Sequence, residues 1–409
     1  MEQLSLETAL PVPPQQQAAK GLPPALWALC ISAFAIGTTE FVAVGIQPII
    51  SGKLQVSISS AGAIMSMYAL GVAFGGPLLS ALTSRVPRKS LLLAMMVLFI
   101  MGHIASALAP TFGWLLVFRF LSGFAHATYF GVGANIAAAV VAPDKKATAI
   151  AIMFSGLTVA IIVGVPLGTF IGRHFGWRAT FAGVAVLGVI SFIANWLLLP
   201  AHLSTGAPLR LRDQLRVLKT GPVMLALAIT ALGYGGTFVT FTYLATLLEK
   251  VTQFSAGAVN WLLLLYGVAV ALGNLVGGRL SNTNPARALI RILLVQTGLL
   301  FLFTFTMYAK VPAVINLFLV GAGSLANGPG LQLYVVQLTQ RYLPGAEDIA
   351  SSLNIAAFNI GVALGALVGG LTVDYAPPGL TATPWIAALI VFMGAMLTMI
   401  SYRRHRAVR

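Results

Sequence analysis

Twelve long apolar segments separated by short polar loops make up most of this 409-residue chain. A helix needs roughly 20 apolar residues to cross the hydrocarbon core of a bilayer, and each segment is about that long. Barrel strands that face a lumen alternate with polar residues, which these continuous runs do not. We therefore predict an all-α membrane protein with twelve spans, at 24–49, 58–83, 90–109, 113–139, 147–171, 179–200, 222–247, 257–278, 288–309, 312–339, 349–373 and 385–402.

Only 8% of the residues are charged, whereas a soluble domain carries about 25%. The net charge of +15 would suggest a nucleic-acid partner, but the 24 Lys and Arg form short clusters between the apolar segments. That distribution is typical of cytoplasmic loops beside anionic lipid, so we expect a lipid bilayer and no nucleic acid as partner. The single cysteine, Cys30, excludes an intramolecular disulfide and a cysteine-based metal site, and we expect neither a metal nor a cofactor.

The basic residues also predict the orientation of the chain. With both termini in the cytoplasm, 18 of the 24 Lys and Arg fall on cytoplasmic flanks and five on outer flanks. The remaining one, Arg119, lies inside a span. This bias favours cytoplasmic termini and an even number of spans.

The longest polar interruption, 201–221, divides the chain into halves. Its leucines alternate with Arg and Lys, which fits either a basic helix on the inner membrane surface or a solvated linker. We expect a disordered cytoplasmic tail at 1–22, a six-helix bundle at 23–200, a cytoplasmic linker at 201–221, a second six-helix bundle at 222–402 and a basic cytoplasmic tail at 403–409.

The two halves show weak internal similarity. A shift of 198 residues aligns the loop SALTSRVPRK at 80–89 with GRLSNTNPAR at 278–287, and a similar shift brings Thr39 near Thr237. Duplicated halves predict a substrate site near the bilayer midplane, at the interface between the repeats.

Four stretches of the sequence carry a resemblance to a known family. They are Leu82, Arg85, Arg88 and Lys89 in the loop after span two; Gly37-Thr-Thr-Glu40-Phe41 in span one; Arg119 with Gly123 in span four; and Gly156, Gly164, Pro166 and Gly168 in span five. On these residues the chain, from about 24 to 402, resembles the major facilitator superfamily. The resemblance is to its twelve-span drug:proton antiporter branch, which includes arabinose-efflux and chloramphenicol-resistance permeases.

The resemblance implies a fold of two pseudo-symmetric six-helix bundles in a bacterial inner membrane. It implies a role in proton coupling for Arg119, and it places Gly156, Gly164, Pro166 and Gly168 where the halves meet on the periplasmic side. It also implies a conformational latch at Arg85, Arg88 and Lys89. The latch departs from the family pattern, because Ser84 stands where the family has an acidic residue.

Ionisable groups inside hydrocarbon cost about 2.5–3.5 kcal/mol on insertion scales, which makes each one a functional candidate. Glu40 is the only acidic residue deep in a predicted span, and Arg119, His103 and His126 are the basic ones. We predict that Glu40 carries the proton and Arg119 sets its proton affinity, with His126 as a polar substrate contact or second proton site. The alternatives are a fixed Glu40–Arg119 pair and a hydrogen-bonded core histidine at 126; for His103 we expect a structural role.

The second half offers polar but uncharged side chains at similar depth. Amides and phenols can hydrogen-bond a ligand without the cost of a buried charge, although single members can instead join helices. The predicted substrate-binding residues are Tyr234, Tyr243, Gln332, Asn354, Phe358 and Asn359.

Together these features predict a secondary active transporter that exports a small organic solute, such as a sugar, nucleoside or drug-like molecule, by proton antiport. We expect it to function as a monomer. A symporter or facilitator of the same fold remains open, as does a receptor or scaffold that moves no solute. The sequence has no phosphate-binding loop and no plausible catalytic set, so we expect no enzyme activity.

Overall fold

The computed structural model describes residues 23–83, 86–142, 145–200 and 211–406. Within these ranges the protein is helical without strands, and twelve helices are long and apolar enough to cross a membrane. The predicted spans agree with the observed ones to within a few residues. The first span is longer than predicted, because α1 (Pro24–Leu54) continues through Pro48 and ends where Gln55 adopts a left-handed conformation at φ 52°.

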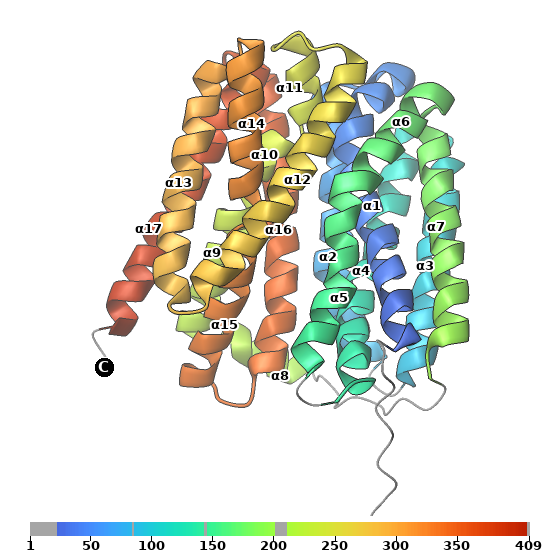
Figure 1. Cartoon of the computed structure of the whole chain (residues 1–409), viewed down its shortest axis with the longest axis vertical. Coiled ribbons are helices and arrows are strands. Elements are labelled where there is room, and N and C mark those ends of the chain that lie inside the picture. Colours follow the sequence, from blue (N-terminus) through green and yellow to red (C-terminus); the bar gives the residue numbers. More distant parts are fainter. Residues whose placement is uncertain (1–22, 84–85, 143–144, 201–210, 407–409) are drawn as a thin grey trace, which may run out of the picture.

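The spans form two six-helix bundles that stand side by side (Figure 1). The N-terminal bundle contains α1, α2 (Ile58–Leu82), α3 (Arg88–Ala107), α4 (Phe112–Ala139), α5 (Lys146–Val159), the π-helical segment η2 (Ala160–Gly164), α6 (Val165–Phe175) and α7 (Trp177–Leu198). The C-terminal bundle contains α9 (Gly221–Gly235), α10 (Phe238–Phe241), α11 (Leu244–Lys250), α12 (Ala256–Ser281), α13 (Pro285–Thr306), α14 (Lys310–Ser324), α15 (Gly328–Tyr342), α16 (Glu347–Tyr375), the short η3 (Gly379–Ala382) and α17 (Thr383–Arg406).

Three of the twelve spans are interrupted in their interior, and the twelfth only begins with the short 3-10 helix η3 before α17. The fifth span consists of α5, η2 and α6, the seventh of α9, α10 and α11, and the tenth of α14 and α15. A change of helix type inside a membrane is tolerated where the freed backbone groups are buried in protein or line a cavity. We therefore expect the backbone at these three interruptions to be buried in protein or to line a cavity.

The linker contributes one short helix, α8 (Leu211–Leu218), which lies between the bundles at one end (Figure 1). Gln214 and Val217 are buried against the protein, while Leu215 and Leu218 are exposed beside the basic residues Arg212 and Arg216. Residues 201–210, which complete the predicted linker, lie outside the described ranges, as do the predicted tail at 1–22 and residues 407–409 of the predicted tail at 403–409.

The bundles contact each other along α2 and α16, where Ser66 donates to the Ala363 carbonyl at 3.1 Å, and at one end of the molecule. The start of α1 and the end of α17 lie at the same end of the molecule, here called the termini end, and the opposite end is the far end (Figure 1). At the far end Thr246 hydrogen-bonds Gln47 at 3.3 Å, and Arg173 forms an ion pair with Glu249. These contacts join α1 and α6 of the first bundle to α11 of the second, so the far end is closed.

Candidate functional site

Three predicted ionisable residues come together in the interior of the N-terminal bundle. Glu40, near the middle of α1, is 8% exposed; Arg119 and His126, both on α4, are 0% and 6% exposed. Among the described residues Glu40 is the only buried acidic side chain. A carboxyl, a guanidinium and an imidazole so far from bulk water must rely on one another and on nearby polar groups.

Arg119 is held by the residue that precedes Glu40. Its Nη1 donates to Thr39 Oγ1 at 2.7 Å and its Nη2 donates to the Thr39 carbonyl at 3.1 Å. The guanidinium carbon lies 4.1 Å from the ring centre of Tyr68, an arrangement that favours a cation over an aromatic face. Arg119 and Glu40 are near enough to interact electrostatically, but the described residues contain no Arg119–Glu40 ion pair within 4.0 Å.

A chain of hydrogen bonds continues from Thr39 to α3. The His103 ring lies with Nδ1 2.7 Å from the Phe99 carbonyl and Nε2 2.6 Å from Thr39 Oγ1. A carbonyl can only accept, so Nδ1 carries the hydrogen and Nε2 accepts from the Thr39 hydroxyl. Both ring nitrogens of His103 are therefore used in joining α3 to α1, and the geometry matches a structural role.

Glu40 faces His126 rather than Arg119. Its Oε2 lies 4.0 Å from His126 Nδ1, and the same nitrogen is 3.2 Å from the Tyr68 hydroxyl. Glu40 is thus beyond hydrogen-bond distance of His126, whose Nδ1 is paired with the Tyr68 hydroxyl. Tyr68 was missed in the sequence, where a tyrosine in an apolar span gives no sign of which neighbour it meets.

The C-terminal bundle brings some of the predicted substrate residues together. The rings of Tyr234 and Phe358 lie 4.7 Å apart at 78°, and Tyr234 is close enough to Glu40 to interact with its charge. Asn354 donates to Gln332 Oε1 at 2.7 Å, so these two amides join α15 to α16. Asn359 donates to a carbonyl of its own helix, and the side-chain oxygens of Asn354 and Asn359 are buried without partners.

Tyr243 lies apart from these residues, where α11 meets α2 and α16. It is fully buried, and its hydroxyl donates to the carbonyl of Ala366 at 3.0 Å and approaches that of Ser59 at 3.4 Å. A Cβ on Gly62 would lie 2.2 Å from the same hydroxyl. The phenol thus fills the contact between the bundles, an arrangement that the sequence pattern did not distinguish from a ligand contact.

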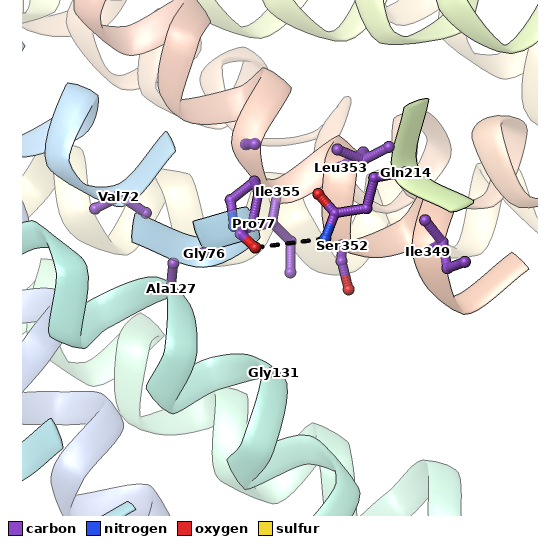
Figure 2. Close-up of a pocket in the computed structure, with 11 residues that line it drawn as sticks. Val72, Gly76, Pro77, Ala127, Gly131, Gln214, Ile349, Ser352, Leu353 and Ile355 are labelled. Atoms are coloured by element: carbon purple, nitrogen blue, oxygen red, sulfur yellow. Dashed lines mark hydrogen bonds between the residues drawn. The ribbon is translucent and has the colours of Figure 1, made fainter. Parts of the chain in front are cut away.

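A small cavity with about 40 Å³ of free space opens between the bundles in the termini-end half. Figure 2 shows α2 and α4 on one side of it and α16 on the other, with Gln214 of α8 reaching across to the Pro77 carbonyl at 3.4 Å. The lining is mostly apolar, and consists of Val72, Gly76, Pro77, Ala127, Gly131, Gln214, Ile349, Ser352, Leu353, Ile355 and Ala356. We call it the termini-end cavity.

The residues of the family-like motifs mostly pack within the N-terminal bundle. A Cβ on Gly156 would lie 2.1 Å from the Cys30 carbonyl of α1, and Gly164 and Gly168 face the next turns of α1 in the same way. Pro166 lies in the first turn of α6, directly after the π-helical segment η2.

The contact that η2 makes with the other bundle is different. It runs through Ile161, whose carbonyl would lie 2.6 Å from a Cβ on Gly267 of α12. In the loop motif, Arg88 begins α3 and Lys89 donates to the Leu199 carbonyl at 2.6 Å, whereas Arg85 lies outside the described ranges.

A family model described as Major Facilitator Superfamily matches residues 29–347. The chain belongs to the major facilitator superfamily. It is 49% identical to the uncharacterized MFS-type transporter YtbD of Bacillus subtilis, over 92% of this chain and 94% of that protein. It is 38% identical to the inner membrane transport protein YdhP of Escherichia coli O157:H7, over 93% and 96% of the two chains.

Other similar proteins carry more specific names. The chloramphenicol resistance protein of Streptomyces lividans is 34% identical, over 93% of this chain and 97% of that protein. Among solved structures, a bacterial homologue of the human lysosomal transporter Spinster, in an inward-facing and unoccupied conformation, superimposes with a TM-score of 0.73 at 17% identity, over 94% and 98% of the chains. That likeness shows the fold.

The superfamily membership and the twelve spans make this protein a multi-pass membrane transporter of the bacterial inner membrane, and not an enzyme. The predicted membership of the superfamily, the predicted twelve-helix fold and the prediction of a transporter are confirmed. The roles of the individual site residues stay predictions.

Proposed function

We propose that this transporter exports a small organic solute in exchange for protons, and that Glu40 carries the proton. Relatives of similar length include a chloramphenicol resistance protein and a probable sugar efflux transporter of Helicobacter pylori, the latter 31% identical over 84% of this chain. The second name describes efflux of a solute, which supports export as the direction.

The observation that carries the proposal is the surroundings of Glu40. It is the only buried carboxyl of the described residues, it lies 4.0 Å from His126 Nδ1, and Arg119 is fixed beside it through Thr39. Burial disfavours the charged carboxylate, whereas the nearby guanidinium favours it. A change in water access or an arriving ligand can tip this balance and so load or release a proton.

The shape of the protein fits one state of an alternating-access cycle. The cavity opens in the termini-end half and the far end is closed. With the termini in the cytoplasm, as the basic residues predict, this is the inward-facing state. In the proposed cycle, solute enters from the cytoplasm while Glu40 releases its proton, and the bundles then rock to open the far end. One chain supplies both bundles, which supports a functional monomer.

The test compares wild-type protein with Glu40→Gln in reconstituted vesicles under an imposed pH gradient. Flux of labelled chloramphenicol, sugars and nucleosides is measured together with proton movement. Because glutamine keeps the size of the side chain and cannot titrate, we expect gradient-driven flux to be lost while solute exchange without a gradient persists. Asp374→Asn serves as the matched control, because Asp374 is an exposed carboxyl on α16.

Three results would overturn the mechanism. Gradient-driven flux in Glu40→Gln equal to that of wild type would make Glu40 a structural residue. Wild-type flux that ignores the pH gradient altogether would favour the facilitator, and accumulation of solute together with protons would favour the symporter.

A further inference from the structure

All three interrupted spans meet at one pocket. It is lined by Ile161 of η2 in the fifth span, by Thr237 at the junction of α9 and α10 in the seventh, and by Ser324 and Leu325 at the junction of α14 and α15 in the tenth. The remaining lining residues are Phe41, Phe238, Phe241, Tyr266 and Val270. We call this the aromatic pocket; it shares no lining residue with the termini-end cavity.

The meeting of three interrupted spans at one pocket indicates a functional position, because interrupted helices are costly inside a membrane. Each interruption frees backbone groups from the regular hydrogen-bond pattern, and π-helical turns are frequently found at functional sites. In transporters built from repeats, discontinuous helices are where ligands bind. Three of them around one pocket, with Phe41 and Ile161 from one bundle and the rest from the other, point to a ligand position between the bundles.

The walls of the pocket are aromatic. Phe241 stacks on Tyr266 with ring centres 5.0 Å apart and an interplanar angle of 20°. Phe41 and Phe238 contact Phe241 edge to face, with interplanar angles of 69° and 86°. None of the nine lining residues is charged. The free space among these side chains is about 10 Å³, room for about one water molecule, so a ligand ring enters only when the side chains or the bundles move apart. The uncharged aromatic lining suits an uncharged ring rather than a charged solute.

The hydrogen bonds of the lining residues indicate which polar group a ligand ring should carry. Ser324 donates to the Val320 carbonyl at 2.7 Å, so the 2.7 Å bond between Tyr266 and Ser324 is donated by the phenol, and its oxygen still has room to accept. Thr237 Oγ1 accepts from Gln296, and among the described residues no acceptor takes its hydrogen. The pocket therefore offers one unused donor and one unused acceptor.

A comparison of equivalent positions in the two halves supports a free donor at Thr237. Thr39 and Thr237 are 198 residues apart, and each accepts a hydrogen bond from a longer side chain, Arg119 in one bundle and Gln296 in the other. In the first bundle the Thr39 hydroxyl passes its own hydrogen to His103. Among the described residues of the second bundle no acceptor takes the place of His103, which leaves the Thr237 hydroxyl free for a ligand.

We propose that the aromatic pocket is a substrate subsite that binds a neutral planar ring carrying a hydrogen-bond acceptor, with Thr237 donating to the acceptor and Tyr266 and Phe241 packing on the ring. The proposal rests on the proposed transport function for its biological meaning. It is separate in its chemistry, because the subsite binds its ligand whether or not Glu40 couples protons.

The experiment is direct binding to purified protein in detergent, without membrane or gradient. Three neutral nitroaromatic probes, chloramphenicol, 4-nitrophenyl β-D-glucoside and 4-nitrobenzyl alcohol, are compared with methyl β-D-glucoside, which has the sugar without the ring. We expect at least one aromatic probe to bind at least about tenfold more tightly than the methyl glucoside. Loss of an aromatic contact weakens such binding by between about twofold and tenfold, the effect we expect of Tyr266→Leu.

Further variants separate the ring from the hydrogen bonds. Tyr266→Phe should retain most of the binding, and Thr237→Val should weaken binding of the nitroaromatics severalfold. Phe305→Leu, which removes an exposed ring on α13, is the matched control and should bind as wild type. Thermal unfolding of each variant shows that it is folded.

If no aromatic probe exceeds the methyl glucoside, or if folded Tyr266→Leu and Thr237→Val bind as wild type, the subsite is refuted even where Glu40→Gln abolishes gradient-driven flux. If the aromatic probes bind and respond to these variants while Glu40→Gln transports normally, the subsite stands and the proton mechanism fails.

Discussion

Arg119 is bound to Thr39 at two points, through the hydroxyl oxygen at 2.7 Å and through the backbone carbonyl at 3.1 Å. The guanidinium is thereby attached to the residue next to Glu40 rather than to the carboxylate itself. An arginine bonded directly to Glu40 would hold it charged at all times. An arginine fixed one residue away favours the charge without capturing it, which leaves the carboxyl able to exchange a proton.

Thr39→Val should destabilise the protein. The change removes the acceptor for Arg119 Nη1 and the donor to His103 Nε2, both of them buried, and an unsatisfied buried polar group costs about 1–3 kcal/mol. The free energy of unfolding should fall by about that amount, measured as a lower thermal unfolding temperature in detergent. Thr39→Ser keeps the hydroxyl and should lie much closer to wild type; equal unfolding temperatures for the two variants would contradict this account.

Gly156→Ala should also destabilise, for a steric reason. The new methyl would lie 2.1 Å from the Cys30 carbonyl and 2.9 Å from the Phe34 nitrogen, both backbone atoms of α1, so the helices must separate. Forcing extra volume into a packed interior costs about 1–3 kcal/mol. Gly298→Ala is the matched control, because nothing lies within 4 Å of a Cβ at that position. Thermal unfolding of the two variants decides, and similar values would refute the clash.

The sequence predicted the spans well because their length and apolarity are set by the bilayer, whatever the helices contact. Glu40, Arg119 and His126 could be found for the same reason, since a charge in hydrocarbon is conspicuous. Their partners could not be found. Thr39 and Tyr68 are ordinary residues in apolar runs, and only the rotation of α1, α2 and α4 about their axes decides which of them meets the guanidinium.

The interrupted helices show a second limit. The glycines at 235 and 236 suggest a break in the seventh span, but η2 lies in the run Ala-Ile-Ile-Val-Gly, whose composition is compatible with a regular helix. The sequence also could not separate Tyr243, a contact between bundles, from Tyr234, which faces Phe358. Both are tyrosines in one span, and the difference arises from how the bundles dock.

The Arg173–Glu249 ion pair should hold the far end closed. The pair joins α6 to α11 across the bundles and is partly exposed, so its contribution is about 1 kcal/mol at most, or about fivefold in a conformational equilibrium. Its effect can be read from Thr246→Cys in a Cys30→Ala background, because Thr246 is buried between the bundles at that end. Arg173→Gln should increase labelling of this cysteine by a membrane-impermeant maleimide by up to about fivefold.

A charge-swapped protein provides the control for this pair. Arg173→Glu combined with Glu249→Arg restores opposite charges and should return the labelling rate toward that of the reporter protein, whereas either reversal alone should raise it through repulsion. If labelling is unchanged in Arg173→Gln and in both single reversals, the ion pair does not set the closed state.

Tyr243→Phe separates a conformational role from a ligand contact. The phenol hydroxyl donates to the Ala366 carbonyl of its own bundle at 3.0 Å and lies 3.4 Å from the Ser59 carbonyl of α2, and the ring occupies space left by Gly62. Losing the weaker contact across the bundles, worth about 1 kcal/mol at most, should raise the labelling of Thr246→Cys by up to about fivefold, in the same reporter background. Binding of the nitroaromatic probes in detergent should change little by comparison, because Tyr243 lines neither the aromatic pocket nor the termini-end cavity. If Tyr243→Phe instead weakens binding as much as Tyr266→Leu and leaves the labelling rate unchanged, Tyr243 contacts substrate, as its place in the sequence first suggested, and the far end is held closed by other residues.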